Sequence, residues 1–330
     1  MQYIFKNKND YNSCIEFLID NNIAFEKHIV ADIFVIILLE SDKKEYIESK
    51  QNEFKNSLDI NIDYGYMTSK EYKEKTTFKV GSINIGADEP VIISGPCSVE
   101  NYDTMLAITK ELKKADVNLI RAGAFKPRTS PYDFQGIGRD GVEMLQKISK
   151  EEDIPVVTEI MDVRDLDFMY DKIDVFQVGT RNMYNYPLLR ELGKIDKPIL
   201  LKRGFSATIK ELLLSAEYIM KEGNEKIILC ERGIRTFSDI SRNTLDISVI
   251  PILKELTHLP VMVDPSHAAG QRSLIKSLSC AAIGAGADGL VIESHINPNQ
   301  AWSDSIQTID TKYMKKIVDL SRRIKREILL

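Results

Sequence analysis

The feature that most constrains the fold of this chain is a series of short apolar runs that begins near residue 90. Segments of helical length and period, such as 104–114 and 208–221, separate the runs. The eight runs occupy residues 91–97, 118–124, 155–160, 175–180, 198–204, 226–233, 260–267 and 289–295. Because they are continuously apolar rather than alternating, they are typical of strands that are covered on both faces, as in a parallel sheet. Eight strand–helix units over roughly 240 residues predict a (β/α)8 TIM barrel, with an open doubly wound sheet as the structural alternative.

A different pattern fills residues 1–66. It predicts a strand at 2–6, a helix at 9–21 capped by Asn9 or Asp10, paired strands at 23–30 and 32–39, a polar helix at 42–56 and a last strand at 58–64. This order is that of a small ferredoxin-like α+β unit. A charged linker at 70–75 and a hairpin turning at Gly81 and Ser82 follow. We therefore expect three segments: a ferredoxin-like domain over 1–66, a linker and β-hairpin over 67–89, and a barrel over 90–330.

Composition excludes several classes of protein. The 330 residues include 44 Lys and Arg against 49 Asp and Glu, a formal net charge of −5, which argues against a general nucleic-acid binder. The longest apolar run, 33–39, has seven residues where a membrane span needs about 20, and the first residues do not resemble a signal peptide. The four cysteines are widely scattered, without a paired motif. We therefore expect a cytoplasmic protein with reduced thiols and no membrane or nucleic-acid partner.

Charged side chains crowd the carboxyl ends of the predicted strands, which is where the active sites of such barrels lie. The cations of four strands would meet in one cavity, and their repulsion is relieved when anions fill it. Arginine forks match both phosphate and carboxylate groups, so we expect a multiply charged anionic substrate. The residues at these ends are Cys97, Arg121, Lys126, Glu159, Arg181, Lys202, Arg203, Glu231, Arg232, Asp264, His267, Glu293 and His295.

A second group at these ends predicts a metal site. Cys97, His267 and Glu293 follow the first, seventh and eighth runs, which are neighbours in a closed barrel, and Asp304 lies in the next loop. A mixed set of Cys, His, Glu and Asp suits a borderline divalent ion such as Mn²⁺, Fe²⁺, Zn²⁺ or Co²⁺. Each member also has an ordinary interpretation: a buried thiol, a hydrogen-bonded histidine or an ion-pair partner. His295 competes with Glu293 as a ligand if the last strand is shifted.

Long motifs of the chain resemble those of one enzyme family. They are GPCSVEN (95–101), RAGAFKPRTSPYDFQGIG (121–138), QVGTRNM (177–183), LLKRGF (200–205), ILCERGIRTF (228–237), DPSHAAG (264–270) and an ESH…WSD region that ends at 304. In this order they resemble the type I 3-deoxy-D-arabino-heptulosonate 7-phosphate (DAHP) synthases. The similar subgroup carries an ACT-like, ferredoxin-like regulatory domain before the barrel. The motifs run from about residue 86 to residue 304, whereas the N-terminal likeness rests on length and strand order.

The resemblance implies a transferase that condenses phosphoenolpyruvate with erythrose 4-phosphate and releases phosphate, the first step of the shikimate pathway to aromatic amino acids. It implies that Cys97, His267, Glu293 and Asp304 hold one divalent metal. By the same likeness, Arg121 and Lys202 would bind the phosphoenolpyruvate carboxylate, and Arg181, Arg232 and the Thr180 backbone its phosphate. Erythrose 4-phosphate would lie against Lys126, Pro127, Arg128, Thr129 and Ser130.

Chemical roles follow from these positions. The enol carbon of phosphoenolpyruvate is a weak nucleophile, so a metal is expected to polarise the aldehyde as a Lewis acid. Lys126 would donate a proton or hydrogen bond to the same oxygen, which makes Lys126, Cys97 and His267 the candidate catalytic residues. The individual roles of Glu159 and Glu231 stay open.

Three other functions remain as alternatives. The nearest is 3-deoxy-D-manno-octulosonate 8-phosphate synthase, which uses arabinose 5-phosphate, but the KPRTS stretch at 126–130 favours the four-carbon sugar. A Schiff-base aldolase would use Lys202, and a catalytically inactive barrel could sense a phosphometabolite. For residues 1–66 we expect either an aromatic amino acid inhibitor, Tyr or Phe, or a contact without a ligand. The assembly is expected to be a homodimer or homotetramer.

Overall fold

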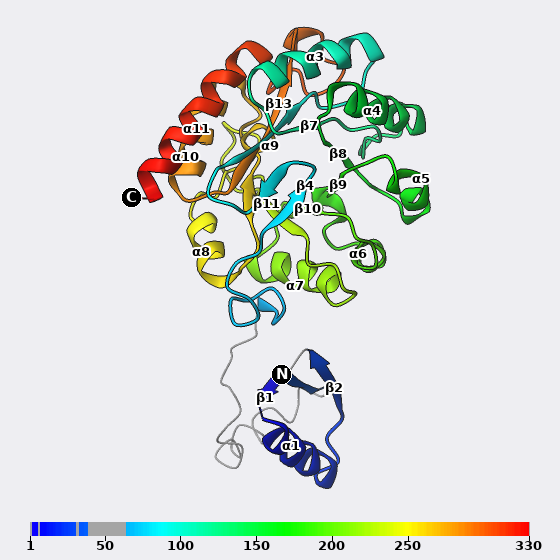
Figure 1. Ribbon diagram of the computed structural model, residues 1–330, viewed down its shortest axis with the longest axis vertical. Coiled ribbons are helices and arrows are strands. Elements are labelled where there is room, and N and C mark those ends of the chain that lie inside the picture. Colours follow the sequence, from blue (N-terminus) through cyan, green and yellow to red (C-terminus); the bar gives the residue numbers. More distant parts are fainter. Residues whose placement is uncertain (1, 6, 31–32, 39–63, 330) are drawn as a thin grey trace. The chain divides into compact units, whose positions relative to one another are not determined.

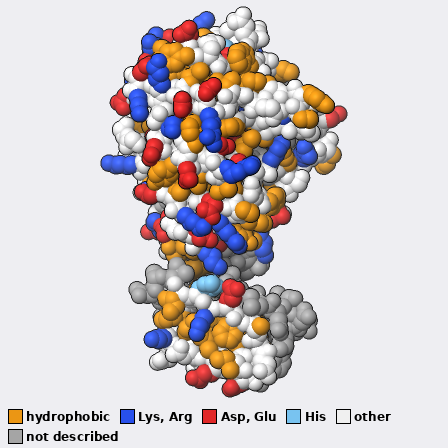
Figure 2. Space-filling view, turned by 90° about the vertical axis from the view of Figure 1, so that its right-hand side faces the viewer, with side chains coloured by type: hydrophobic (Ala, Val, Ile, Leu, Met, Phe, Trp, Pro, Cys, Tyr) orange, Lys and Arg blue, Asp and Glu red, His pale blue; other side chains and the backbone are white. Residues whose placement is uncertain are grey.

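The computed structural model describes residues 2–5, 7–30, 33–38 and 64–329. The chain divides into two compact units, Met1–Asp63 and Tyr64–Leu330. Among the described helices, none is both long enough and apolar enough to span a bilayer. On the face of the larger unit that Figure 2 shows, acidic and basic side chains are interspersed.

Eight parallel strands form a closed ring in the larger unit, with the helices outside it (Figure 1). Each strand pairs with the next along the chain, and the last strand pairs with both the seventh and the first. Each of the eight predicted runs contains one of these strands, so the barrel is confirmed and the open sheet is excluded. The ring consists of β6 (Val91–Gly95), β7 (Leu119–Arg121), β8 (Val156–Glu159), β9 (Val175–Val178), β10 (Ile199–Lys202), β11 (Ile227–Glu231), β12 (Val261–Val263) and β13 (Gly289–His295).

Helices connect the strands and pack around the ring. The sequence sets where they begin: Thr208 and Glu211 form a capping box at the start of α7, and Asn101 caps α3. Short strand β14 (Ile309–Asp310) continues the sheet beyond β13. The helices are α3 (Tyr102–Lys114), α4 (Arg139–Glu152), α5 (Leu166–Tyr170), α6 (Tyr186–Gly193), α7 (Ile209–Met220), α8 (Val249–Leu256), α9 (Pro265–Ala269), α10 (Ile275–Gly284) and α11 (Met314–Leu329). The 3-10 helices are η3 (Val163–Asp165), η4 (Thr180–Asn182), η5 (Arg272–Leu274), η6 (Pro298–Gln300) and η7 (Thr311–Tyr313).

An apolar cluster fills the inside of the barrel. It includes Leu119 of β7, Leu200 of β10 and Val291 of β13. The expected hairpin, β4 (Phe78–Val80) and β5 (Ile83–Ile85), adds Val80 and Ile85 to this cluster. The hairpin therefore covers the amino-terminal end of the barrel, and the carboxyl ends of the strands carry the polar groups.

The segment just before the hairpin is fixed to the barrel by polar contacts. The Glu217 carboxylate on α7 accepts hydrogen bonds from the backbone N–H groups of Tyr66, Met67 and Thr68, at 2.9–3.1 Å. His258, between α8 and β12, contacts the Met67 carbonyl through Nε2 at 2.7 Å and the Thr76 hydroxyl through Nδ1 at 2.6 Å. Residues 66–76 thus belong structurally to the larger unit.

The smaller unit contains an antiparallel sheet of order β1–β3–β2 and one described helix. Its elements are β1 (Gln2–Phe5), α1 (Lys8–Asp20), β2 (Phe25–Val30) and β3 (Ile33–Leu38). The predicted cap was wrong: Asn7 is extended and its side chain accepts from the Asn9 N–H, whereas Asn9 and Asp10 lie inside the first turn. The helix expected at 42–56 and the strand expected at 58–64, except residue 64, lie outside the described residues.

Candidate active site

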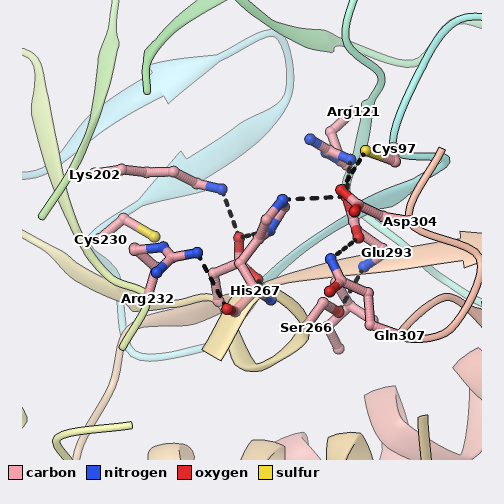
Figure 3. Close-up of polar contacts among 12 residues, drawn as sticks. Cys97, Arg121, Lys202, Cys230, Arg232, Ser266, His267, Glu293, Asp304 and Gln307 are labelled. Atoms are coloured by element: carbon pink, nitrogen blue, oxygen red, sulfur yellow. Dashed lines mark hydrogen bonds and ion pairs between the residues drawn. The ribbon is translucent and has the colours of Figure 1, made fainter. Parts of the chain in front are cut away.

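Four side chains from distant parts of the chain meet at the carboxyl end of the barrel. Cys97 follows β6, His267 lies on α9, Glu293 lies in β13, and Asp304 lies in the loop after η6. One donor atom of each lies within 4.8 Å of the others. The Cys97 Sγ is 3.0 Å from Asp304 Oδ2, and His267 Nε2 is 3.3 Å from Glu293 Oε1 (Figure 3). Asp304 has a φ of +52°, a left-handed conformation that aspartate tolerates better than most residues.

Asp264, at the end of β12, orients the histidine of this group. Its Oδ2 lies 2.6 Å from His267 Nδ1, and its Oδ1 accepts from the His267 backbone N–H at 2.9 Å. A carboxylate at Nδ1 favours the tautomer that is protonated there, which leaves the Nε2 lone pair directed at Glu293. The same Oδ2 also pairs with Lys202 Nζ at 2.5 Å. One buried carboxylate therefore joins the histidine to the cations of the neighbouring cavity.

Glu293 is held in place by three further groups. Its backbone N–H donates to the Ser266 hydroxyl at 2.9 Å, and its Oε1 accepts from Arg121 Nη1 at 3.0 Å. Its Oε2 accepts from the Gln307 side-chain amide. These contacts come from three different segments, so the carboxylate has a defined position before any ligand binds.

The electrostatics of the group depend on the burial of its members. Burial raises the pKa of the Cys97 thiol to about 12, and the nearby negative charge of Glu293 adds to this shift. Burial acts against ionisation of Asp304 as well, but the hydrogen bond from Cys97 and the positive charges of Arg242 and Lys126 bring the pKa of its carboxyl to about 2. The group thus combines a thiol with two ionised carboxylates that oppose its deprotonation.

These residues fit a divalent cation. Carboxylates, thiol and imidazole converge on one point in a region shielded from water, and a cation there relieves the repulsion between Glu293 and Asp304. A positive ion would also favour the thiolate form of Cys97, which is the ligating form. The mixed donor set agrees with a borderline first-row metal and selects no single one.

A cavity rich in cations adjoins this group at the mouth of the barrel. It is lined by Arg121, Lys126, Pro127, Arg128, Thr129, Asp133, Glu159, Gln177, Gly179, Thr180, Arg181, Lys202, Phe205, Arg232, Arg242, His267 and Asp304. Seven of these side chains are Lys or Arg and three are Asp or Glu. The expected crowding of cations is therefore present, and it favours polyanionic ligands.

Several of these cations are almost fully buried and fixed by specific partners. Arg121, Lys202 and Arg232 are 4%, 3% and 2% exposed. Arg232 donates to the carbonyls of Gly233 and His267 at 3.2 and 3.1 Å, and the Arg121 Nε has no hydrogen-bond partner among the described residues. Lys126 Nζ lies 2.9 Å from Cys97 Sγ, so it links the cavity to the metal-binding group. Donors held in this way are ready to bind substrate oxygens.

Glu159, at the end of β8, faces the same cavity. Its Oε1 is buried without a hydrogen-bond partner among the described residues, while Oε2 accepts from Gln177 Nε2 at 3.3 Å. Burial raises the pKa of this carboxyl, although Lys126, Lys202 and Arg121 act in the opposite direction. A Cβ atom on Gly179 would lie 1.9 Å from Oε1, so the glycine makes room for this side chain.

Four residues named from the sequence belong neither to the cavity lining nor to the metal-binding group and its supports. Arg203 pairs with Glu231 at 2.9 Å, and Glu231 also accepts from the Gly233 N–H, so both stabilise the end of β11. His295 lies 3.2 Å from Glu100 and does not join the metal-binding group. The Ser130 hydroxyl accepts from the Tyr132 N–H within its own turn. Side chains on the same strands point in different directions, and position in the sequence alone does not distinguish them.

Sequence reasoning missed several contributors to the site. Gln177 and Phe205 stand inside motifs that were recognised, and Asp133 lies in the long loop after β7. Arg242 contacts Gln307 at 2.9 Å and lies 3.4 Å from Asp304. These last two residues come from loops that fold back over the site, and no periodic pattern reveals such a return.

Comparison with known proteins agrees with this geometry. A family model described as the DAHP synthetase I family matches residues 54–329. The phospho-2-dehydro-3-deoxyheptonate aldolase of Thermotoga maritima is 45% identical over 261 residues, covering 79% of this chain and 77% of its own length. The 2-dehydro-3-deoxyphosphooctonate aldolase of Syntrophobacter fumaroxidans is 28% identical over 270 residues, covering 75% and 93%.

Solved structures give the same result. A crystal structure of the Thermotoga maritima DAHP synthase has a TM-score of 0.79 and 38% identity, covering 99% of this chain and 97% of that one. A truncated form of the synthase from that organism has a TM-score of 0.74 and 41% identity, covering 79% and 97%. The closed barrel, its anion cavity and these likenesses lead to one conclusion: the chain belongs to the DAHP synthetase I family.

Proposed function

We propose that this DAHP synthase carries out its condensation at the junction of the cation-lined cavity and the Cys97, His267, Glu293 and Asp304 group. The enzyme joins phosphoenolpyruvate to erythrose 4-phosphate, with release of phosphate. The observation that carries the proposed location is Lys126, which lines the cavity and lies 2.9 Å from the Cys97 sulfur. A substrate bound among the cations would therefore lie beside the metal.

Phosphoenolpyruvate is assigned to the deeper cations. Arg121 and Lys202 bind its carboxylate, while Arg181, Arg232 and the Thr180 backbone bind its phosphate. Arg121 and Lys202 already pair with Glu293 and Asp264, so they are fixed in orientation and retain donors for a ligand. Fixed cations bind the anion without first losing side-chain entropy, and this favours the reactive alignment of the two substrates.

Erythrose 4-phosphate is assigned to the loop after β7, at residues 126–130. Arg128 is held by the Phe134 carbonyl at 3.0 Å and by the Ser303 hydroxyl at 2.6 Å. Arg128 and Thr129 would bind the sugar phosphate, and Lys126 the aldehyde oxygen. Ser130 would contribute to this subsite by shaping the loop, because its hydroxyl accepts a hydrogen bond from the Tyr132 N–H.

The chain's own groups account for most steps. Carbon 3 of phosphoenolpyruvate forms the new bond to the aldehyde carbon, and Lys126 supplies a proton to the aldehyde oxygen. The metal, when bound, supplies Lewis-acid polarisation of that aldehyde. Water then adds to carbon 2 and the carbon–oxygen bond to phosphate breaks. Arg181 and Arg232 stabilise the departing phosphate.

One assay tests this function. Phosphoenolpyruvate consumption is followed with erythrose 4-phosphate and with arabinose 5-phosphate, each with and without a chelator. We expect turnover of the four-carbon sugar, loss on chelation and recovery with Mn²⁺. Turnover of arabinose 5-phosphate alone would assign the chain to the octulosonate enzymes, the group to which the 28% identical relative belongs by name. Activity after complete metal removal would overturn the metal site.

A Schiff-base mechanism has its own test. Lys202 Nζ lies 2.5 Å from the Asp264 carboxylate, and this ion pair occupies the amine that an imine would need. We therefore expect no covalent adduct when borohydride is added during turnover. A trapped adduct on Lys202 would favour the aldolase alternative.

We further propose that the smaller unit, expected from the sequence at residues 1–66, is an ACT-like regulatory domain that binds Tyr or Phe, and that the enzyme is a homodimer or homotetramer. A deletion that starts the chain at Tyr64 keeps the backbone groups bound by Glu217, so the barrel unit retains its own contacts. This variant should keep its activity and lose inhibition by the amino acid. Retained inhibition would refute the regulatory role, and light scattering measures the assembly.

A further inference from the structure

Phe205 lies three residues after the end of β10, in the cavity wall, and three guanidinium groups lie near its ring. The distances from the ring centroid to the guanidinium carbons are 4.6 Å for Arg235, 4.8 Å for Arg232 and 5.6 Å for Arg181. All three lie within the range of a cation–π interaction. The arginines come from three segments: η4, the residue after β11, and the loop that follows. A single aromatic ring therefore connects cations of different origin.

The three arginines differ in how much else holds them. Arg232 is buried and donates to two carbonyl groups, those of Gly233 and His267. In the described part of the chain, the guanidiniums of Arg181 and Arg235 form no hydrogen bond or ion pair. The backbone N–H of Arg235 also donates to the Phe205 backbone carbonyl at 2.7 Å, which keeps the two residues adjacent. For two of the three side chains, Phe205 is thus the main group that fixes their position.

The ring has a clear electrostatic role in such a cluster. Three guanidiniums that approach one point repel each other, and the negative face of an aromatic ring offsets part of this repulsion. Without the ring, the two exposed arginines can move apart into solvent. Anion binding would then have to bring these two arginines back to the site, at a cost in side-chain entropy.

We propose that Phe205 is a positioning residue that gathers Arg181, Arg232 and Arg235 into a preformed phosphate-binding cluster, with Arg235 as its third cation. The inference rests on the proposed function, because that function assigns Arg181 and Arg232 to the phosphate of phosphoenolpyruvate. It adds to that function the ring and Arg235, which no motif reasoning selected. The aromatic face, rather than the bulk of the side chain, is what the cluster requires.

The test compares variants of the full-length, metal-loaded protein, with inorganic phosphate as the probe. In Phe205→Leu the apolar volume stays and the π face is lost, so phosphate binding measured by calorimetry should weaken about tenfold. Phe205→Tyr keeps the π face and should restore affinity to within about twofold. In turnover, KM for phosphoenolpyruvate should rise in parallel while KM for erythrose 4-phosphate changes little, since only one subsite is altered.

Phe168 on α5 provides a matched control outside the cavity. Its ring also carries two cations, Lys172 at 4.2 Å and Arg139 at 4.8 Å. Phe168→Leu should leave phosphate affinity unchanged, which separates the local cluster from a general loss of cation–π contacts. If Phe205→Leu does not fold, Phe205→Met removes the π face with a more adaptable side chain.

Defined results would overturn the proposal. Phosphate affinity in folded Phe205→Leu or Phe205→Met that matches the parent would exclude the ring as a positioning group. Equal weakening in Phe205→Tyr and Phe205→Leu would show that packing, not the π face, matters. The calorimetric experiment needs no turnover, so phosphate binding that depends on Phe205 would stand even if the condensation assay failed. That outcome separates the two proposals.

Discussion

The inside of the barrel has two layers, and they differ in chemistry although they are built on the same strands. On β7, Leu119 belongs to the apolar interior cluster, and Arg121, two residues later, faces the cavity. On β10 the corresponding pair is Leu200 and Lys202. Residues i and i+2 of a strand share a face, so each of these two strands carries its apolar residue below and its charged residue above.

The contrast shows how one fold serves two needs. The apolar layer gains free energy from burial and gives the ring its stability. The charged layer is costly to bury, and part of this cost is offset because some of its ions are paired, as Lys202 is with Asp264 and Arg121 with Glu293. Substitutions in the lower layer should therefore change stability, and substitutions in the upper layer should change binding and chemistry.

The largest effect should come from the thiol of the upper layer. Cys97→Ala removes the softest donor of the metal-binding group, and we expect activity to fall about 10³-fold with loss of bound metal, since a Lewis acid supplies several kcal/mol. Metal content and phosphoenolpyruvate consumption measure this. Cys230→Ala, a buried thiol in the apolar cluster, is the control and should retain both. Equal loss in the two variants would contradict the division into layers.

The next effect should appear in the lower layer. Leu200→Ala creates a cavity in the barrel interior, and we expect the free energy of unfolding to fall by about 2–5 kcal/mol. Denaturation by urea measures the change, and KM for both substrates should stay near the parent values in the folded fraction. A shift in KM as large as the shift in stability would show that the layers are coupled.

A smaller effect should follow from the carboxylate that orients the histidine. Asp264→Asn keeps the shape but weakens the hold on His267 Nδ1, and we expect metal affinity to drop about 10- to 100-fold. Competition with a fluorescent chelator measures the affinity. Asp246→Asn is the control, because Asp246 contacts Arg203 outside the cavity. An unchanged metal affinity in Asp264→Asn would remove Asp264 from the site.

The smallest effect should be seen at the opposite end of the barrel, where polar groups serve structure. Burial lowers the pKa of His258, so the folded protein resists a proton that the unfolded chain accepts below about pH 6.5. Because the unfolded state binds more protons in that range, stability should decrease as the pH falls below the usual histidine pKa. Thermal unfolding from pH 7.5 to 5.5 measures this, and His258→Gln should flatten the profile. A slope that persists in the variant would assign the effect to other groups.

The barrel and most of the charged layer could be predicted because both follow from regular strand patterns. The runs that contain Arg121, Lys202 and Glu293 each placed a charged residue just beyond apolar ones, and parallel strands bring such ends together. Arg203 follows Lys202 directly, so the pleat turns it to the other face of the strand, toward Glu231. His295 shares a face with Glu293 but lies farther along the strand and contacts Glu100, so the pattern overcounted. Sequence alone does not show which of two adjacent residues at the end of a strand faces the barrel interior, because this depends on the register of the strand in the sheet.

Loop residues were the least predictable part of the site. Arg242 and Gln307 reach Asp304 and Glu293 only because two loops fold back over the barrel, and their positions depend on tertiary contacts. The same dependence explains why Asp304 could be proposed only from its place in the loop after the last run and not from periodicity. The helix cap at Asn7 was missed for a simpler reason, since three nearby polar residues were all acceptable caps.

The pairing of β13 with β6 determines how late in synthesis the barrel can close. These two strands are the last and first of the ring, and they carry or precede Glu293 and Cys97. Cys97 and Asp304 are 207 positions apart, so a ribosome must release nearly the whole barrel before both donors are available. Ring closure and completion of the metal-binding group are therefore one topological event. A nascent chain that stops short of β13 would have no closed ring, and it would lack Glu293 and Asp304, two of the three residues that share the metal-binding group with Cys97.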